Sequence, residues 1–135
     1  MTATLAELIG THNIQVDQHL DRQVTIPVLT GLQRQGDVII IPSHQGRQAI
    51  TPVPATGAPV VRGENGGNTH AIVGNALCDL FDASATNLTL ATLTVPQGQV
   101  AYLAHPEHGY MGIGPGTYEL RRQREQADEL RMVQD

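Results

Sequence analysis

The sequence has no tryptophan and no lysine, and its 135 residues include only three tyrosines, one phenylalanine and one cysteine. A single cysteine excludes an internal disulfide, and it excludes zinc and iron–sulfur sites built from several cysteines. Because large rings are scarce, the core must be built from valine, isoleucine, leucine and alanine. Such a thinly filled core favours additional burial against other subunits.

Positive charge is also scarce. The chain has eight basic residues, all arginine, and thirteen acidic residues, which gives a formal net charge of -5. Hydrophobic residues make up 40% of the chain, which excludes a fully disordered protein. This acidic balance weighs against nucleic-acid binding, since the three arginines at 121, 122 and 124 are too few for a strong basic patch. No apolar run reaches the roughly 18 residues of a membrane span, and no signal peptide begins the chain. We therefore expect a protein of the cytoplasm or of a virion, neither transmembrane nor secreted by a signal peptide.

The middle of the chain consists of short apolar or alternating segments separated by glycine and proline turns. This pattern predicts a mostly β protein, a single antiparallel β-sandwich or small barrel. No segment between the strands is long and helical enough for a parallel βαβ unit. The expected strands are 38–41, ended by Pro42, then 48–53, 58–62, 69–73, 76–81, 87–95, 99–104, 110–113 and 117–123. Because of Pro27, residues 24–28 are expected to form an edge strand or an arm.

Three parts follow from this reading. Residues 1–22 form an N-terminal arm with a short helix over 2–10, which Thr2 or Thr4 can cap and Gly10 can end. Residues 23–123 form the β-domain. Residues 124–135, rich in Gln, Glu, Ala, Leu and Arg, are expected to form a short C-terminal helical tail.

Four residues near two predicted turns carry metal-binding chemistry: His70, His105, Glu107 and His108. Turns at one end of an antiparallel domain can meet, and three imidazoles with a carboxylate suit one zinc, iron, nickel or manganese ion. Cupin-type barrels use a similar ligand set, although with another spacing. The alternative is that these histidines cap turns and bond backbone groups.

The sequence predicts no catalytic residue and no site for an organic cofactor. Ser43 and His44 are adjacent, so their side chains diverge along a strand, and no nucleophile elbow is present. Cys78 lies in an apolar segment and is expected to be a small buried hydrophobe. The Gly-rich segment 63–67 has no lysine and precedes a strand, so it does not fit a phosphate-binding loop. A non-enzymatic role is therefore favoured.

Several motifs in order resemble a family of small bacterial and phage-encoded β-rich proteins of unknown function. They are the Gly-Asp-Val strand that ends in Pro42, the His-Pro-Glu-His turn at 105–108, and the Gly-x-Tyr segment at 116–118 that leads to Gln-Arg-Glu at 123–125. The resemblance covers about residues 35–125 and implies a fold and a set of residues. The family often carries Gly-His-x-His where this chain has Asn68 in place of the first imidazole.

The leading functional hypothesis is a non-enzymatic assembly or binding module. Its arms would reach neighbouring copies, as in a homo-oligomer or a decoration-type accessory protein on the subunits of a virion or shell. The alternative is a metal-binding, cupin-like β-barrel enzyme that uses the His/Glu cluster and one transition-metal ion. A third hypothesis is a domain that binds a peptide strand at an exposed sheet edge.

Overall fold

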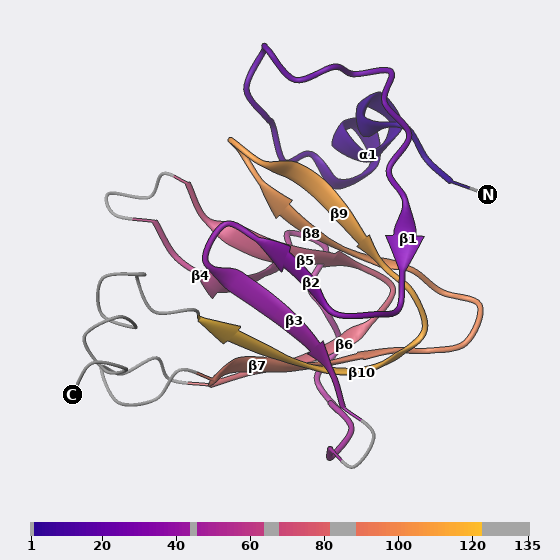
Figure 1. The fold of residues 1–135 in the computed structure, drawn as a ribbon, viewed down its shortest axis with the longest axis vertical. Helices are drawn as coiled ribbons and strands as arrows, with labels where there is room; N and C mark the ends of the chain where they lie inside the picture. Colours follow the sequence, from indigo (N-terminus) through magenta and orange to yellow (C-terminus); the bar gives the residue numbers. More distant parts are fainter. Residues whose placement is uncertain (1, 44–45, 64–67, 82–88, 123–135) are drawn as a thin grey trace, which may run out of the picture.

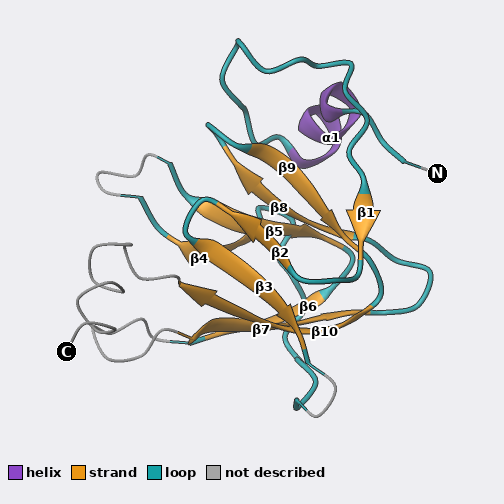
Figure 2. Ribbon diagram, in the orientation of Figure 1, coloured by secondary structure: helices purple, strands orange, loops and turns teal. Residues whose placement is uncertain are grey.

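The computed structural model describes residues 2–43, 46–63, 68–81 and 89–122, and within them it has two facing five-stranded sheets and one helix (Figure 1). The sheet orders are β1-β9-β8-β5-β4 and β2-β3-β10-β7-β6. The prediction of a mostly β, sandwich-like fold is confirmed, and the sheets do not close into a barrel (Figure 2). The elements are α1 (Leu5–His12), β1 (Val28–Leu29), β2 (Gln33–Gln35), β3 (Val38–Pro42), β4 (Ala58–Val61), β5 (His70–Gly74), β6 (Leu77–Leu80), β7 (Thr89–Val95), β8 (Ala101–His105), β9 (Gly109–Ile113) and β10 (Gly116–Arg122).

All strand pairs in the two sheets are antiparallel except the pair of β1 with β9, where Val28 lies opposite Gly112 in parallel. The close approach of β1 depends on the glycines of β9. A Cβ at Gly112 would lie only 2.5 Å from the carbonyl oxygen of Pro27. The segment predicted as a strand at 48–53 makes only an isolated bridge, between Pro52 and Leu77.

The space between the sheets is filled by aliphatic side chains, as the scarcity of aromatic residues required. Ile40, Leu93 and Leu103 are among the fully buried side chains of this core. Tyr118 is the one tyrosine in it, and its hydroxyl donates to the carbonyl oxygen of Gly114 at 2.7 Å. Alternation along the strands places these residues inward and their neighbours outward.

The N-terminal segment packs against its own domain. Thr4 and Glu7 form a capping box at the start of α1, and the helix ends at His12 and not at Gly10. Leu5 and Leu8 join a second apolar cluster on the outer face of β8 and β9. This finding corrects the expectation of an arm that needs a neighbouring copy to be ordered. The predicted helix over 124–135 lies outside the described residues.

Candidate metal centre

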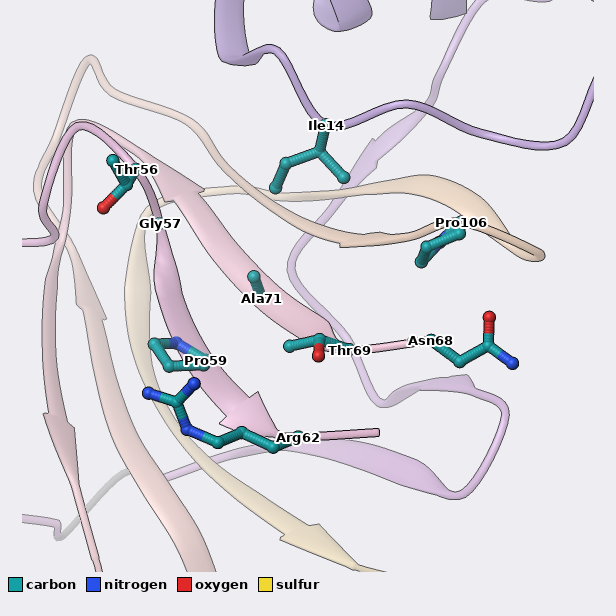
Figure 3. A pocket seen from close by; sticks show the side chains of 9 residues that line it. All are labelled: Ile14, Thr56, Gly57, Pro59, Arg62, Asn68, Thr69, Ala71 and Pro106. Atoms are coloured by element: carbon teal, nitrogen blue, oxygen red, sulfur yellow. The ribbon is translucent and has the colours of Figure 1, made fainter. Parts of the chain in front are cut away.

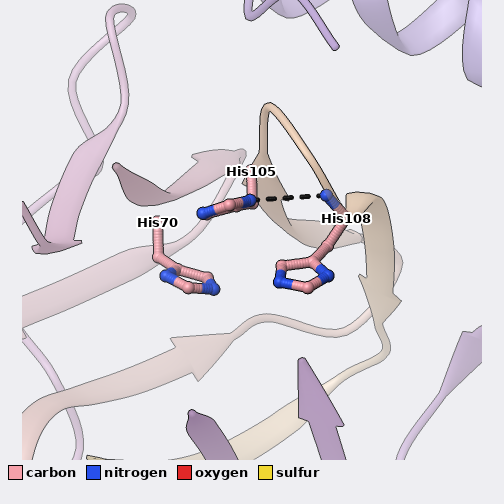
Figure 4. Close-up of side chains that lie close together, drawn as sticks. All are labelled: His70, His105 and His108. Atoms are coloured by element: carbon pink, nitrogen blue, oxygen red, sulfur yellow. Dashed lines mark hydrogen bonds between the residues drawn. The ribbon is translucent and has the colours of Figure 1, made fainter. Parts of the chain in front are cut away.

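Three histidines converge at one end of the sandwich, beside the turn between β2 and β3 (Figure 4). His70 begins β5 and His105 ends β8, and because Ala71 pairs with Ala104, the register places the two histidines opposite each other. His108 lies in the hairpin turn between β8 and β9. The ring of His105 has its centroid 4.2 Å from that of His70 and 4.6 Å from that of His108. The three rings each offer a nitrogen within 4.8 Å of the others.

His70 is buried without a hydrogen bond. Its side chain is 4% exposed, and neither Nδ1 nor Nε2 has a hydrogen-bond partner of acceptable geometry. Burial and then the neighbouring His105 are the main causes that lower the pKa of His70 from 6.5 to about 4, while Asp37 and the Gln35 backbone act in the opposite direction. The ring is therefore neutral at pH 7, and a neutral imidazole is the form that binds metals.

His105 is also buried, but it has a structural role in its turn. Its Nδ1 accepts the backbone N–H groups of Glu107 at 3.0 Å and of His108 at 3.3 Å. A nitrogen that accepts is unprotonated, so these bonds assign the proton of the neutral ring to Nε2. Burial, followed by the effect of His108, lowers the pKa of His105. The expectation that a loop histidine caps a turn thus describes this residue.

His108 is exposed, and it lies against Gly36 in the turn between β2 and β3. His108 belongs to one sheet and this turn belongs to the other. Gly36 in that turn has φ +59, and a Cβ on it would lie 3.1 Å from His108 Nε2 and 3.3 Å from His70 Nε2. Both the backbone conformation and the available space therefore favour glycine at this position. The sequence showed Gly36 only as a turn residue, and its place above the rings follows from how the two sheets face each other.

Gln35 is a second residue of this site that the sequence did not reveal. It is 6% exposed, and its Nε2 donates to the carbonyl oxygens of Leu103 at 3.1 Å and Gly109 at 3.4 Å. Its Oε1 is buried without a partner. In the described parts of the chain, the buried side-chain atoms without a partner are this oxygen and the two nitrogens of His70. Such atoms are costly, and here they belong to neighbouring residues.

Glu107, the fourth predicted ligand, is not part of the three-nitrogen group. Its carboxylate accepts a hydrogen bond from Asn68 Nδ2 at 3.0 Å, on the exposed side of the turn. The contact joins the approach to β5 with the β8–β9 turn, so it holds together the two segments that carry His70 and His108. Asn68 thus positions the turn.

Two cavities border this end of the domain. One, of about 340 Å³, is lined by His108, Gly36 and Arg34 together with Tyr110 and Met111. The other, of about 470 Å³, lies between the N-terminal segment and the β4–β5 pair, and Arg62 lines it (Figure 3). The histidine cluster borders the first cavity and not the second.

The remaining candidate nucleophile is inert. Cys78 is buried in the inner core, and burial raises the pKa of its thiol to about 12. The prediction that it is a small buried hydrophobe agrees with this environment.

Among the described residues, no helix has the length and apolar character needed to cross a membrane.

Comparison with known proteins adds one finding. A family model described as a domain of unknown function (DUF8820) matches residues 34–123. No curated protein and no solved structure matches the chain. The matched region runs from Arg34 to the end of the β-domain and includes all three histidines of the cluster, whereas α1 precedes it.

Proposed function

The chain belongs to the DUF8820 family of domains of unknown function, and we propose that it binds one divalent transition-metal ion through His70, His105 and His108. The observation that carries the proposal is the state of His70. A neutral imidazole with two unpartnered nitrogens is buried against two further imidazoles. A buried polar ring without hydrogen bonds destabilises a fold, so a ligand that satisfies it gives a physical reason for its presence.

The donor set defines the class of metal. Three neutral nitrogens suit zinc, copper, nickel or cobalt better than magnesium or calcium, which prefer oxygen. In a tetrahedral site with Zn–N bonds of about 2.0–2.1 Å, the ligand nitrogens lie ~3.4 Å apart. The rings must therefore close slightly around the ion, and His108, exposed in a turn, is free to do so. The same geometry leaves a fourth position for another ligand.

Coordination by His105 has a specific consequence. Because Nδ1 accepts two turn N–H groups and Nε2 carries the proton, a metal must either displace the turn from Nδ1 or bind Nε2 after the proton has moved to Nδ1. The backbone N–H groups of Glu107 and His108 then lose their acceptor. We expect their amide resonances to shift on metal binding, in a ¹H–¹⁵N spectrum, by more than those of the β8–β9 residues beyond the turn.

The decisive test is a zinc titration against a chromophoric chelator at pH 7.5, on full-length protein first stripped with EDTA. We expect one zinc per chain in the wild type and at least a hundredfold loss of affinity in His70→Leu. His19→Ala removes an exposed histidine outside the cluster and is the matched control, with unchanged affinity. Equal zinc affinity in wild type and His70→Leu would overturn the proposal.

The variant His105→Ala separates the three-histidine site from a two-histidine site. Two results together would show that His105 only caps its turn: full zinc affinity in this variant, and amide resonances of Glu107 and His108 that do not shift when zinc is added to the wild type. We expect a loss of zinc affinity in His105→Ala and shifted amide resonances in the zinc-loaded wild type.

Self-association is a second candidate, and the accessory role on a virion or shell belongs to it. The apolar side chains beside β6 favour it, since Ile50 is 80% and Leu80 is 47% exposed. The backbone N–H of Ile50 donates to Asp79 of β6, which holds the two apolar residues at one sheet edge. Light scattering tests this candidate: a monomeric wild type, or an oligomer unchanged by Ile50→Ser, would contradict it.

A further inference from the structure

We infer that the cavity beside the histidine cluster binds a small carboxylate, with its charged group between the metal and Arg34. This inference rests on the proposed metal site and names what occupies the fourth position. The cavity, of about 340 Å³, has the size expected for a small-molecule site. His108 lines it, so a ligand in the cavity lies beside a ring that holds the metal.

The charge of the cavity selects an anion. The chain as a whole carries a net charge of -5, yet no aspartate or glutamate lines this cavity and Arg34 does. Asp37 follows Gly36 in the same turn and its charge acts on His70 and His105, but it does not line the cavity. A divalent ion held by His108, together with Arg34 on the wall of the same cavity, would give a local positive field that attracts and holds anions.

Arg34 is held in place for this role. Its Nε donates to the carbonyl oxygen of Gly36 at 2.9 Å, which ties the guanidinium to the turn that covers the histidines. In the described ranges no hydrogen bond or ion pair occupies its terminal nitrogens. A guanidinium can donate two parallel hydrogen bonds to an oxyanion such as a carboxylate.

Apart from Gln35, the rest of the wall is apolar and favours an organic anion over an inorganic one. Pro27, Tyr110 and Met111 face the cavity. A short aliphatic chain attached to the carboxylate would cover this surface, and each buried methylene should strengthen binding. Inorganic phosphate would satisfy the charge and leave this wall exposed to water.

The test uses full-length protein loaded with Co²⁺, whose visible absorption reports on its ligands. Acetate, propionate, butyrate and inorganic phosphate are titrated separately. We expect a saturable spectral change with each carboxylate and an affinity that rises about two- to fourfold per added methylene. Arg34→Gln should weaken carboxylate binding about tenfold while Co²⁺ affinity stays unchanged. Arg62→Gln, which alters the arginine of the other cavity, is the matched control and should bind like the wild type.

The outcomes separate this inference from the proposed function. A protein that binds no Co²⁺ through His70 overturns the metal site itself. A normal Co²⁺ spectrum that no carboxylate changes, or that responds equally in Arg34→Gln and wild type, overturns the carboxylate site alone. Tighter binding of phosphate than of butyrate would overturn the assignment of an organic carboxylate.

Discussion

Acid should destabilise the metal-free protein at a pH set by His70. The pKa of this ring is about 4 in the folded protein and 6.5 in the unfolded chain. At a pH between these two values, the unfolded chain therefore binds more protons than the folded protein. Stability from this residue is fully present above pH 6.5 and is lost as the pH falls toward 4. A difference of about 2.5 pKa units corresponds to ~3 kcal/mol of unfolding free energy. His105 and His12, whose pKa values are also lowered, act in the same direction.

Urea unfolding followed by far-UV circular dichroism, in EDTA at several pH values from 7.5 to 4.5, measures this loss. The variant His70→Leu replaces the titrating ring with an apolar side chain of similar size. Between pH 7.5 and 4.5 its unfolding free energy should fall by ~2.5 kcal/mol less than that of the wild type, because the lower limit lies just above the folded pKa. Asp79, whose pKa is lowered from 3.8, titrates below most of this range. Equal pH dependence in the two proteins would refute the reasoning.

The same variant distinguishes a structural histidine from a functional one at pH 7.5. Neither nitrogen of His70 makes a hydrogen bond, so its replacement by leucine leaves no new unpaired group. An unsatisfied buried polar group costs about 1–3 kcal/mol, and we expect metal-free His70→Leu to be at least as stable as the wild type. A loss of more than about 2 kcal/mol would mean that the ring makes stabilising contacts of its own.

Three further predictions concern the surroundings of the site and the core. Gly36→Ala places a methyl group against His108 Nε2 at a positive φ, so zinc affinity should fall at least tenfold, and wild-type affinity would contradict the role given to this turn. Leu8→Ala should lower the free energy of unfolding by about 2–4 kcal/mol in urea, because this side chain of α1 is buried against the sheet, and a loss below 1 kcal/mol would argue against that packing. Cys78 should react with a thiol reagent only as fast as the protein unfolds, and rapid labelling of the folded protein would contradict its burial.

The fold class could be predicted from sequence because its signals are local. The alternating segments and the turns rich in glycine and proline predicted eight of the strands at nearly their observed places, and Pro42 ends β3 as expected. What local patterns do not contain is the pairing of distant strands. The parallel contact of β1 with β9 and the packing of Leu5 and Leu8 on the outer face depend on the assembled sheet.

The site could be predicted only in part, for the same reason. Residue type alone predicted the three histidines as metal ligands, and the register of β5 with β8 brings two of them together. Gln35 and Gly36 come from the opposite sheet and carry no metal-binding signature. Glu107 has the residue type of a ligand, but its carboxylate bonds Asn68 across the turn. Such distinctions depend on side-chain direction, which spacing along the chain does not determine.

X-ray absorption spectroscopy of the zinc-loaded, full-length protein tests the central claim most directly. We expect three imidazole nitrogens at about 2.0–2.1 Å from the ion in the wild type, and the loss of this imidazole signature in His70→Leu. A first shell made of oxygen atoms alone, or a spectrum that is identical in the two proteins, would contradict it.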